Sequence, residues 1–221
     1  MFWASLNKGK EEVISEVAEE IERRDPSKEK IRAVVTDGEK ALQKGVQAQI
    51  PHVCLILDLF HVLERLWQVC YVFHEEGNKE GAEWVKKQIF RILEGKVSQV
   101  IKGIRQSATK RRIHGNNRKT VDDATRYFYR NRSYMRYNEY LTQGLPIASG
   151  SVEGACRNLV KDRMERCGMR WTRDMAEAML KMRAIYLSGD FGDYWSFHIQ
   201  REQERLHPKG KWKPVLGVVQ K

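Results

Sequence analysis

The feature that most constrains the fold is the order of two kinds of hydrophobic pattern along the chain. Two short apolar runs, residues 31–36 and 53–57, come early and are typical of buried strands. Everything between Asp58 and Glu153 has the spacing of helices instead. We therefore predict an α/β fold that is helix-rich overall, in which a small strand-containing core is interrupted by a large all-α insertion.

Local signals predict where the helices and loops lie. The apolar positions of residues 10–24 share one face, with carboxylates opposite, and Asp25-Pro26 should end this helix because proline cannot continue the hydrogen-bond ladder. Further helices are expected over residues 59–73, 77–103, 127–140, 151–166 and 172–187. A basic loop is expected at 111–118, a second loop at 144–150, and a loosely ordered tail after the last helix.

The charge of the chain points toward a polyanionic partner. The 40 Lys and Arg outnumber the 29 Asp and Glu, which gives a net charge of +11. Residues 101–180 alone hold 17 basic and 8 acidic residues, a net charge of +9. A local excess of this kind attracts phosphate backbones through counterion release, so nucleic acid is favoured over a merely solvated basic surface.

The cysteines and the hydropathy exclude other classes. None of the four cysteines forms a C-x-x-C pair, so neither a zinc finger nor a disulfide framework is indicated. No apolar run approaches membrane-spanning length, and the N-terminus lacks a secretory signal. We expect a cytoplasmic protein with free thiols and no membrane partner.

Three acidic positions are candidates for chemistry. Asp37 closes the first apolar run, where ligands gather in α/β sheets, although taken in isolation an ordinary Asp-Gly turn is the favoured explanation. Asp58 and His61 share one face of a helix start, either supporting an active site or acting as a helix cap and a partly buried histidine. Glu153 opens a later helix, where the helix dipole and Arg157 also account for it. Two carboxylates such as Asp37 and Glu153 can share a pair of divalent metals if they meet in space.

Basic and aromatic residues alternate in the segments 110–119 and 127–137. Such segments contact phosphates and stack on bases, but a helix with aromatics in the core and arginines in solvent fits equally well. The candidate DNA-contacting residues are Lys110, Arg111, Arg112, Arg118, Lys119, Arg130, Arg132, Arg157 and Arg163.

Three segments in this order resemble bacterial insertion-sequence transposases, specifically the ISKra group, which is related to the Mutator superfamily. They are the motif around Asp37-Gly38, the motif from Leu57 to Glu64, and the stretch from Gly144 to Cys156 with its continuation to Trp171. The resemblance covers roughly residues 30–175.

The resemblance implies a DDE-type enzyme with an RNase H-like core. Its acidic triad, two aspartates and a glutamate, would bind two Mg²⁺ (or Mn²⁺) ions for phosphodiester hydrolysis and transesterification. Asp37 matches the second aspartate and Glu153 the glutamate, so both are expected to be catalytic metal ligands. Asp58 and His61 match the signature Cys/Asp-x-x-His and would support the active site.

No match to the first aspartate is visible, because the only aspartate before Asp37 is Asp25, in a helix-ending context. We therefore expect the C-terminal portion of a transposase, whose activity alone is in question. The expected segments are an incomplete catalytic core (1–63), a helical insertion (64–146), the C-terminal helices of the core (147–190) and a tail (191–221).

The function expected from this resemblance is metal-dependent cleavage and strand transfer of an insertion sequence. The partners would be double-stranded DNA, as element ends and target, and further copies of the chain in a synaptic complex near the bacterial nucleoid. One alternative is a non-catalytic DNA-binding or regulatory remnant of a transposase. A general RNase H-like nuclease, which would cleave without end specificity, is a weaker alternative.

Overall fold

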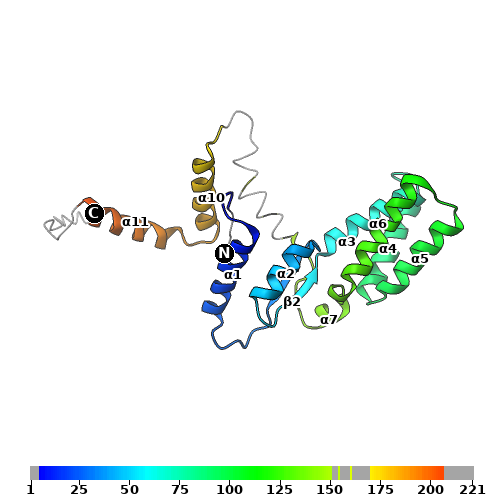
Figure 1. Ribbon diagram of the computed structural model, residues 1–221, viewed down its shortest axis with the longest axis horizontal. Helices are drawn as coiled ribbons and strands as arrows, with labels where there is room; N and C mark the ends of the chain where they lie inside the picture. Colours follow the sequence, from blue (N-terminus) through cyan, green and yellow to red (C-terminus); the bar gives the residue numbers. More distant parts are fainter. Residues whose placement is uncertain (1–4, 151–153, 155–159, 161–169, 207–221) are drawn as a thin grey trace, which may run out of the picture. The chain divides into compact units, whose positions relative to one another are not determined.

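The computed structural model of the protein describes residues 5–150, 154, 160 and 170–206. The chain forms two compact units, one of residues 9–152 and the other of residues 1–8 and 153–221 (Figure 1). The larger unit contains all of the described strands and most of the described helices, so it carries most of the candidate residues.

A parallel βαβ unit lies in the first part of the larger unit. Strands β1 (Ala33–Thr36) and β2 (Cys54–Leu57) pair in parallel and are joined by helix α2 (Lys40–Gln49). Val34 is level with Leu55, and Val35 with Ile56. Because level neighbours in a sheet point to the same face, the first pair packs in one hydrophobic cluster and the second pair in another.

Helices α1 and α2 cover the Val34–Leu55 face of the sheet. Helix α1 (Lys10–Arg24) contributes Ile14, and α2 with its C-terminal flank contributes Val46 and Ile50, all of them buried against Leu55. The sequence predicted α1 with these bounds. Its single fully buried residue fits an amphipathic surface helix.

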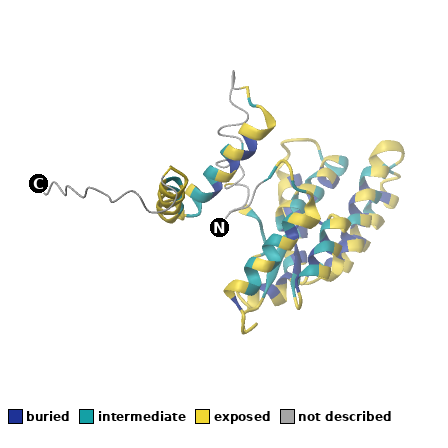
Figure 2. Ribbon diagram, turned by 60° about the vertical axis from the view of Figure 1, so that its left-hand side comes forward, coloured by how far each residue is buried: buried dark blue, intermediate teal, exposed yellow. Residues whose placement is uncertain are grey.

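The second part of the unit is a four-helix bundle. It consists of α3 (Leu59–Phe73), α4 (Lys79–Leu93), α5 (Val97–Lys110) and α6 (Gly115–Asn131), joined by short connections. Each helix packs against two others, α3 and α5 both against α4 and α6. Buried residues line the inside of the bundle, whose core continues onto the second face of the sheet (Figure 2).

A short 3₁₀ turn, η1 (Arg132–Tyr134), and helix α7 (Tyr137–Thr142) follow the bundle. Tyr137 and Tyr140 of α7 are fully buried, and their hydroxyls donate to the backbone oxygens of Leu57 (2.7 Å) and Leu55 (3.3 Å). Burial raises the pKa of Tyr137, so its hydroxyl stays a proton donor at neutral pH. These bonds attach α7 to β2.

The smaller unit contains α10 (Arg173–Leu187) and α11 (Phe191–Leu206). Thr172 caps α10 by accepting from the Met175 amide at 3.3 Å, as the sequence predicted. The buried Glu177 accepts from the Ser5 hydroxyl (2.8 Å) and the Leu6 amide (2.6 Å), and so joins the N-terminal segment to α10.

Several local predictions needed correction. The helix predicted over 77–103 is two helices, because the chain turns at Gly95 with φ +80°. The basic loop is shorter than predicted, since α6 already begins at Gly115. Part of the predicted tail is the regular helix α11, none of whose residues is buried. The division of the chain into the four segments 1–63, 64–146, 147–190 and 191–221 stays a prediction.

The helix-rich character is confirmed, with strands limited to two short ones among the described residues. An RNase H-like core is not demonstrated by these two strands and stays part of the proposal. Of the helices that the structure describes, none has the length and hydrophobicity to cross a membrane. Cys54 and Cys70 are both free thiols.

Candidate active site and nucleic-acid interface

Asp37 and Asp58 follow neighbouring strand ends. Thr36 and Leu57, the last residues of β1 and β2, are level in the parallel pairing, and the Asp58 amide donates to the Thr36 oxygen at 2.8 Å. The two aspartates therefore come directly after the carboxyl ends of adjacent parallel strands, where ligand sites form in α/β sheets. Their environments differ sharply.

Asp37 is exposed and its carboxylate is only partly engaged. One oxygen, Oδ1, accepts from the Glu39 amide at 2.9 Å, which forms a local turn. No other hydrogen bond to this carboxylate is found within the described part of the chain, so Oδ2 has its lone pairs available. An exposed carboxylate with an available oxygen fits a hard divalent cation, which prefers carboxylate and water ligands.

The backbone around Asp37 is held from α6. The Tyr127 hydroxyl donates to the Asp37 carbonyl at 2.7 Å, and Arg130 donates to the Gly38 carbonyl at 3.4 Å. Gly38 has φ +85°, and an added Cβ would lie 2.9 Å from Leu57 Cδ1. The Asp-Gly turn is thus fixed by partners about ninety residues away, which is more than an isolated turn requires.

Two guanidinium groups contact the Tyr127 ring. Arg65 of α3 and Arg130 of α6 lie over its ring, 5.3 and 5.9 Å from the centroid. Burial raises the pKa of Tyr127 to about 12, against the lowering effect of Arg65. The phenol therefore stays protonated at neutral pH and can keep donating to the Asp37 carbonyl.

Asp58 is buried, and both of its carboxylate oxygens accept hydrogen bonds. It is 2% exposed, and its Oδ1 caps α3 by accepting from the Phe60 amide at 3.0 Å. The same oxygen accepts from the Ser149 amide at 3.3 Å, and Oδ2 accepts from the Ser149 hydroxyl. The Leu59 amide also donates to the Ile147 oxygen at 3.0 Å. These bonds fasten the 144–150 loop to the end of β2.

His61 lies in the first turn of α3, and its imidazole contacts Glu64 and not Asp58. Its Nδ1 is 3.1 Å from Glu64 Oε2, and the imidazole side chain is 41% exposed. Its predicted role in supporting the active site stays a prediction.

Glu153, Arg157 and Arg163 lie outside the described residues. Among the residues that are described, no group of three His, Cys, Asp or Glu side chains is placed to hold a metal ion. Of the two described acidic candidates, Asp37 is exposed and Asp58 is buried.

The five predicted DNA-contacting residues of the segment 110–119 fall into two groups. Arg111 donates to the Phe73 carbonyl (2.7 Å) and lies over the Phe73 ring (5.0 Å), so it closes the C-terminal end of α3. Arg118 pairs with Asp122 at 3.1 Å. Lys110, Arg112 and Lys119 are exposed, and within the described residues their side chains have no ion pair or hydrogen bond. The second group is therefore the better placed for phosphate.

Neighbouring arginines allow a matched test of this division. We expect Arg111→Ala to lower the free energy of unfolding by about 1 kcal/mol, because it removes a hydrogen bond to a helix end and a ring contact. Arg112→Ala should leave unfolding nearly unchanged but weaken binding to duplex DNA and reduce its salt dependence. Thermal melts and fluorescence anisotropy at several salt concentrations measure both effects. Equal effects of the two substitutions in both assays would contradict the division.

Three residues of the site were not recognised as such in the sequence. Tyr127 was interpreted as core or as a base-stacking residue, whereas it holds the Asp37 turn. Arg65 and Ser149 were not singled out at all. The roles of Arg65 and Ser149 depend on contacts that α3 makes with α6 and that the 144–150 loop makes with Asp58. In the sequence, the one sign that Ser149 could belong to the site is its position four residues before Glu153.

The described part of the chain thus combines a parallel βαβ unit, an exposed carboxylate after its first strand and a bundle of four helices. The family model DDE_Tnp_ISL3, described as "Transposase", matches residues 2–188. The chain therefore belongs to this transposase family. No curated protein and no solved structure gives a significant match.

The family match confirms the expected class, an insertion-sequence transposase. It does not confirm the ISKra group or the relation to the Mutator superfamily, because the matching family is a different one, ISL3. A role in DNA transposition follows from the family, and with it action on DNA.

Proposed function

We propose that this chain contributes Asp37 and Glu153 to a DDE-type active site that cleaves DNA strands and transfers them during transposition of an insertion sequence. The observation that carries the proposal is the exposed Asp37 carboxylate at the carboxyl end of β1, on a turn held by Tyr127 and Arg130. Family membership supports the reaction class. The RNase H-like character of the core belongs to the same proposal.

The path of the chain toward Glu153 supports the pairing of these two acids. Ser149 is bonded to Asp58, which follows the strand adjacent to β1. Gly150 lies against Phe60, at the start of α3. The described chain therefore reaches this edge of the sheet at Gly150, three positions before Glu153 in the sequence.

The residues of the chain would divide the work as follows. Asp37 and Glu153 would hold divalent cations, Mg²⁺ or Mn²⁺, of which two are expected. Bound there, such ions activate the attacking oxygen and stabilise the leaving oxygen of a phosphodiester. Tyr127 and Arg130 fix the backbone that presents Asp37, and Asp58 fixes the loop that leads to Glu153.

The proposal is tested by nicking of supercoiled plasmid in the presence of Mn²⁺. We expect the wild-type chain to nick DNA and Glu153→Gln to lose this activity, with Glu165→Gln as a matched control on the same stretch of sequence. Retained nicking by Glu153→Gln would remove Glu153 from the active site.

A second candidate is a non-catalytic DNA-binding or regulatory remnant of a transposase. It is favoured by one sequence observation, that only two acids of the triad have matching positions in the chain. This alternative predicts DNA binding by the wild type without any nicking, and inhibition of an intact transposase in mixed assemblies.

A further inference from the structure

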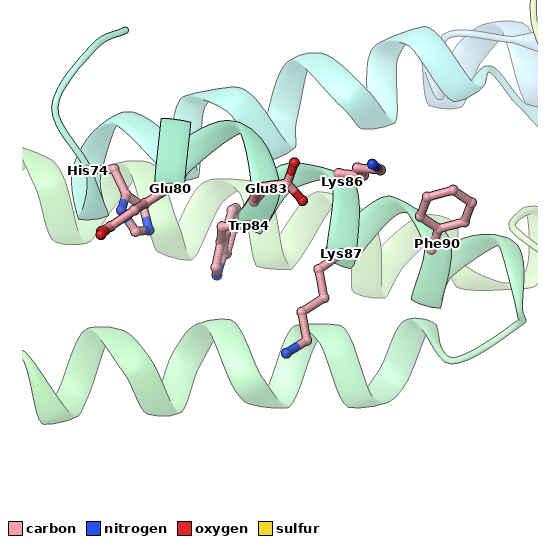
Figure 3. A pocket seen from close by; sticks show the side chains of 7 residues that line it. All are labelled: His74, Glu80, Glu83, Trp84, Lys86, Lys87 and Phe90. Carbon is pink, nitrogen blue, oxygen red and sulfur yellow. The ribbon is translucent and has the colours of Figure 1, made fainter. Parts of the chain in front are cut away.

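The surface of the four-helix bundle has two depressions that differ in charge. One lies along α4 and has a volume of about 470 Å³ (Figure 3). The other lies between α5 and the end of α6 and has a volume of about 320 Å³. We call the second one the α5–α6 groove; its lining residues are Ser98, Ile101, Lys102, Arg105, Gln106 and Tyr129.

Charge separates the two depressions. In the α4 depression, Glu80 and Glu83 accompany Lys86 and Lys87, so that the carboxylates offset the ammonium groups (Figure 3). The α5–α6 groove has Lys102 and Arg105 and no carboxylate in its lining, and α5 has no acidic residue at all. A polyanion is therefore favoured in the α5–α6 groove and not in the α4 depression.

The cations of the α5–α6 groove are not neutralised by neighbours. Arg105 donates to a neutral group, the Thr125 hydroxyl, at 3.2 Å. Within the described residues, Lys102 has no ion pair or hydrogen bond through its side chain. A third cation is next to the groove, because Arg132 stacks over the Tyr129 ring with its guanidinium carbon 4.1 Å from the centroid.

The groove also offers an aromatic surface. Tyr129 lines it and remains 55% exposed although Arg132 covers the ring. The buried Ile101 contributes apolar surface beside it. Exposed aromatic rings among cations stack with unpaired bases, whereas duplex DNA keeps its bases stacked on each other and presents mainly phosphates.

We propose that the α5–α6 groove binds an unpaired segment of DNA. A base stacks against Tyr129, and the flanking phosphates contact Lys102, Arg105 and Arg132. This inference rests on the proposed action on DNA and adds the place where a strand that has left the duplex is held. In this proposal Arg132, which lies over the Tyr129 ring, contacts a phosphate. Lys102, Arg105 and Tyr129 are added to the DNA-contacting residues.

The test uses the full chain in EDTA, so that its result does not depend on the metal site or on strand cleavage. Anisotropy of labelled oligothymidylate of about 15 nucleotides, within the range that such grooves accommodate, is compared with that of a duplex of equal length. We expect Tyr129→Leu to weaken single-strand binding at least fivefold and to leave duplex binding within twofold. Phe90→Leu, in the α4 depression, is the matched control, because Phe90 is 54% exposed and Tyr129 55%.

A second pair of variants tests the charges. Lys102→Gln should weaken binding to single-stranded DNA. In a plot of the logarithm of the binding constant against the logarithm of salt concentration, the slope should become shallower by about 0.7, the value for one lost phosphate contact. Lys86→Gln removes the same charge from the α4 depression and should change neither the affinity for single-stranded DNA nor its salt dependence. Melting curves of all four variants confirm that each is folded.

Three results would overturn the proposal. Equal effects of Tyr129→Leu and Phe90→Leu would remove the stacking site. If Tyr129→Leu weakened the binding of single-stranded and duplex DNA equally, the groove would make a general contact with the DNA backbone instead. Displacement of the oligonucleotide by polyglutamate as effectively as by unlabelled oligothymidylate would assign the groove to an acidic protein segment.

Discussion

Asp37→Asn should lower the rate of DNA nicking by on the order of 100- to 1,000-fold, the range seen when one electrostatic group is removed from an active site. Asparagine keeps the Oδ1 that accepts from the Glu39 amide, so the local turn should survive. It loses the negative charge that a divalent cation requires. Rates of plasmid nicking with Mn²⁺ measure the loss of catalysis, and urea unfolding measures any loss of stability. The free energy of unfolding should change by less than about 1 kcal/mol, as for other surface substitutions.

Glu39→Gln is the matched control for this substitution. Glu39 is an exposed carboxylate two residues away that pairs with Lys10, so its loss should cost little in stability and nothing in nicking. If both substitutions lowered nicking equally, the effect would belong to the general charge of this edge and not to Asp37.

Gly38→Ala should be the most destabilising single change at the site, by roughly 2–4 kcal/mol. Gly38 has φ +85°, a conformation that costs a residue with a side chain about 1–2 kcal/mol. The added Cβ would also lie 2.9 Å from Leu57 Cδ1 and 3.0 Å from the Tyr127 hydroxyl oxygen. Leu57 is fully buried, so it has little room to shift, and overpacking of this kind typically costs about 1–3 kcal/mol.

Urea unfolding measures this effect, with Gly103→Ala as the control. Gly103 lies within helix α5, and an added Cβ would meet no atom within 4 Å. Alanine there should stabilise the chain by about 0.5–1 kcal/mol, because glycine is unfavourable inside a helix. A Gly38→Ala chain as stable as the wild type would mean that the Asp-Gly turn is not held as the structure has it.

Helix α1, both strands and the caps of α3 and α10 could be predicted because their signals are local. Apolar spacing determines the bounds of α1, and Asp58 and Thr172 stand where a side chain accepts from the first turn of a helix. The turn at Gly95 was missed because apolar spacing continues from α4 into α5, and a single glycine is compatible with a continuous helix.

The candidate site was predictable only in part, because most of its contacts join distant parts of the chain. Asp37 was identified from its place at a strand end. The sequence gives no periodic signal for the bond from Tyr127, ninety residues later, or for the bond from Ser149 to Asp58, ninety-one residues apart. Local patterns likewise cannot separate Arg111, which closes α3, from the exposed Arg112 next to it.

We expect Asp37 and Glu153 to bind the same cation, and a double-mutant cycle on Mn²⁺ affinity measures whether they do. Calorimetric titrations would compare the wild type with Asp37→Asn, Glu153→Gln and the double variant. If the two acids share an ion, each single substitution weakens binding and the double substitution weakens it far less than the two losses together predict. Losses that add independently, or titrations that neither substitution changes, would contradict the account.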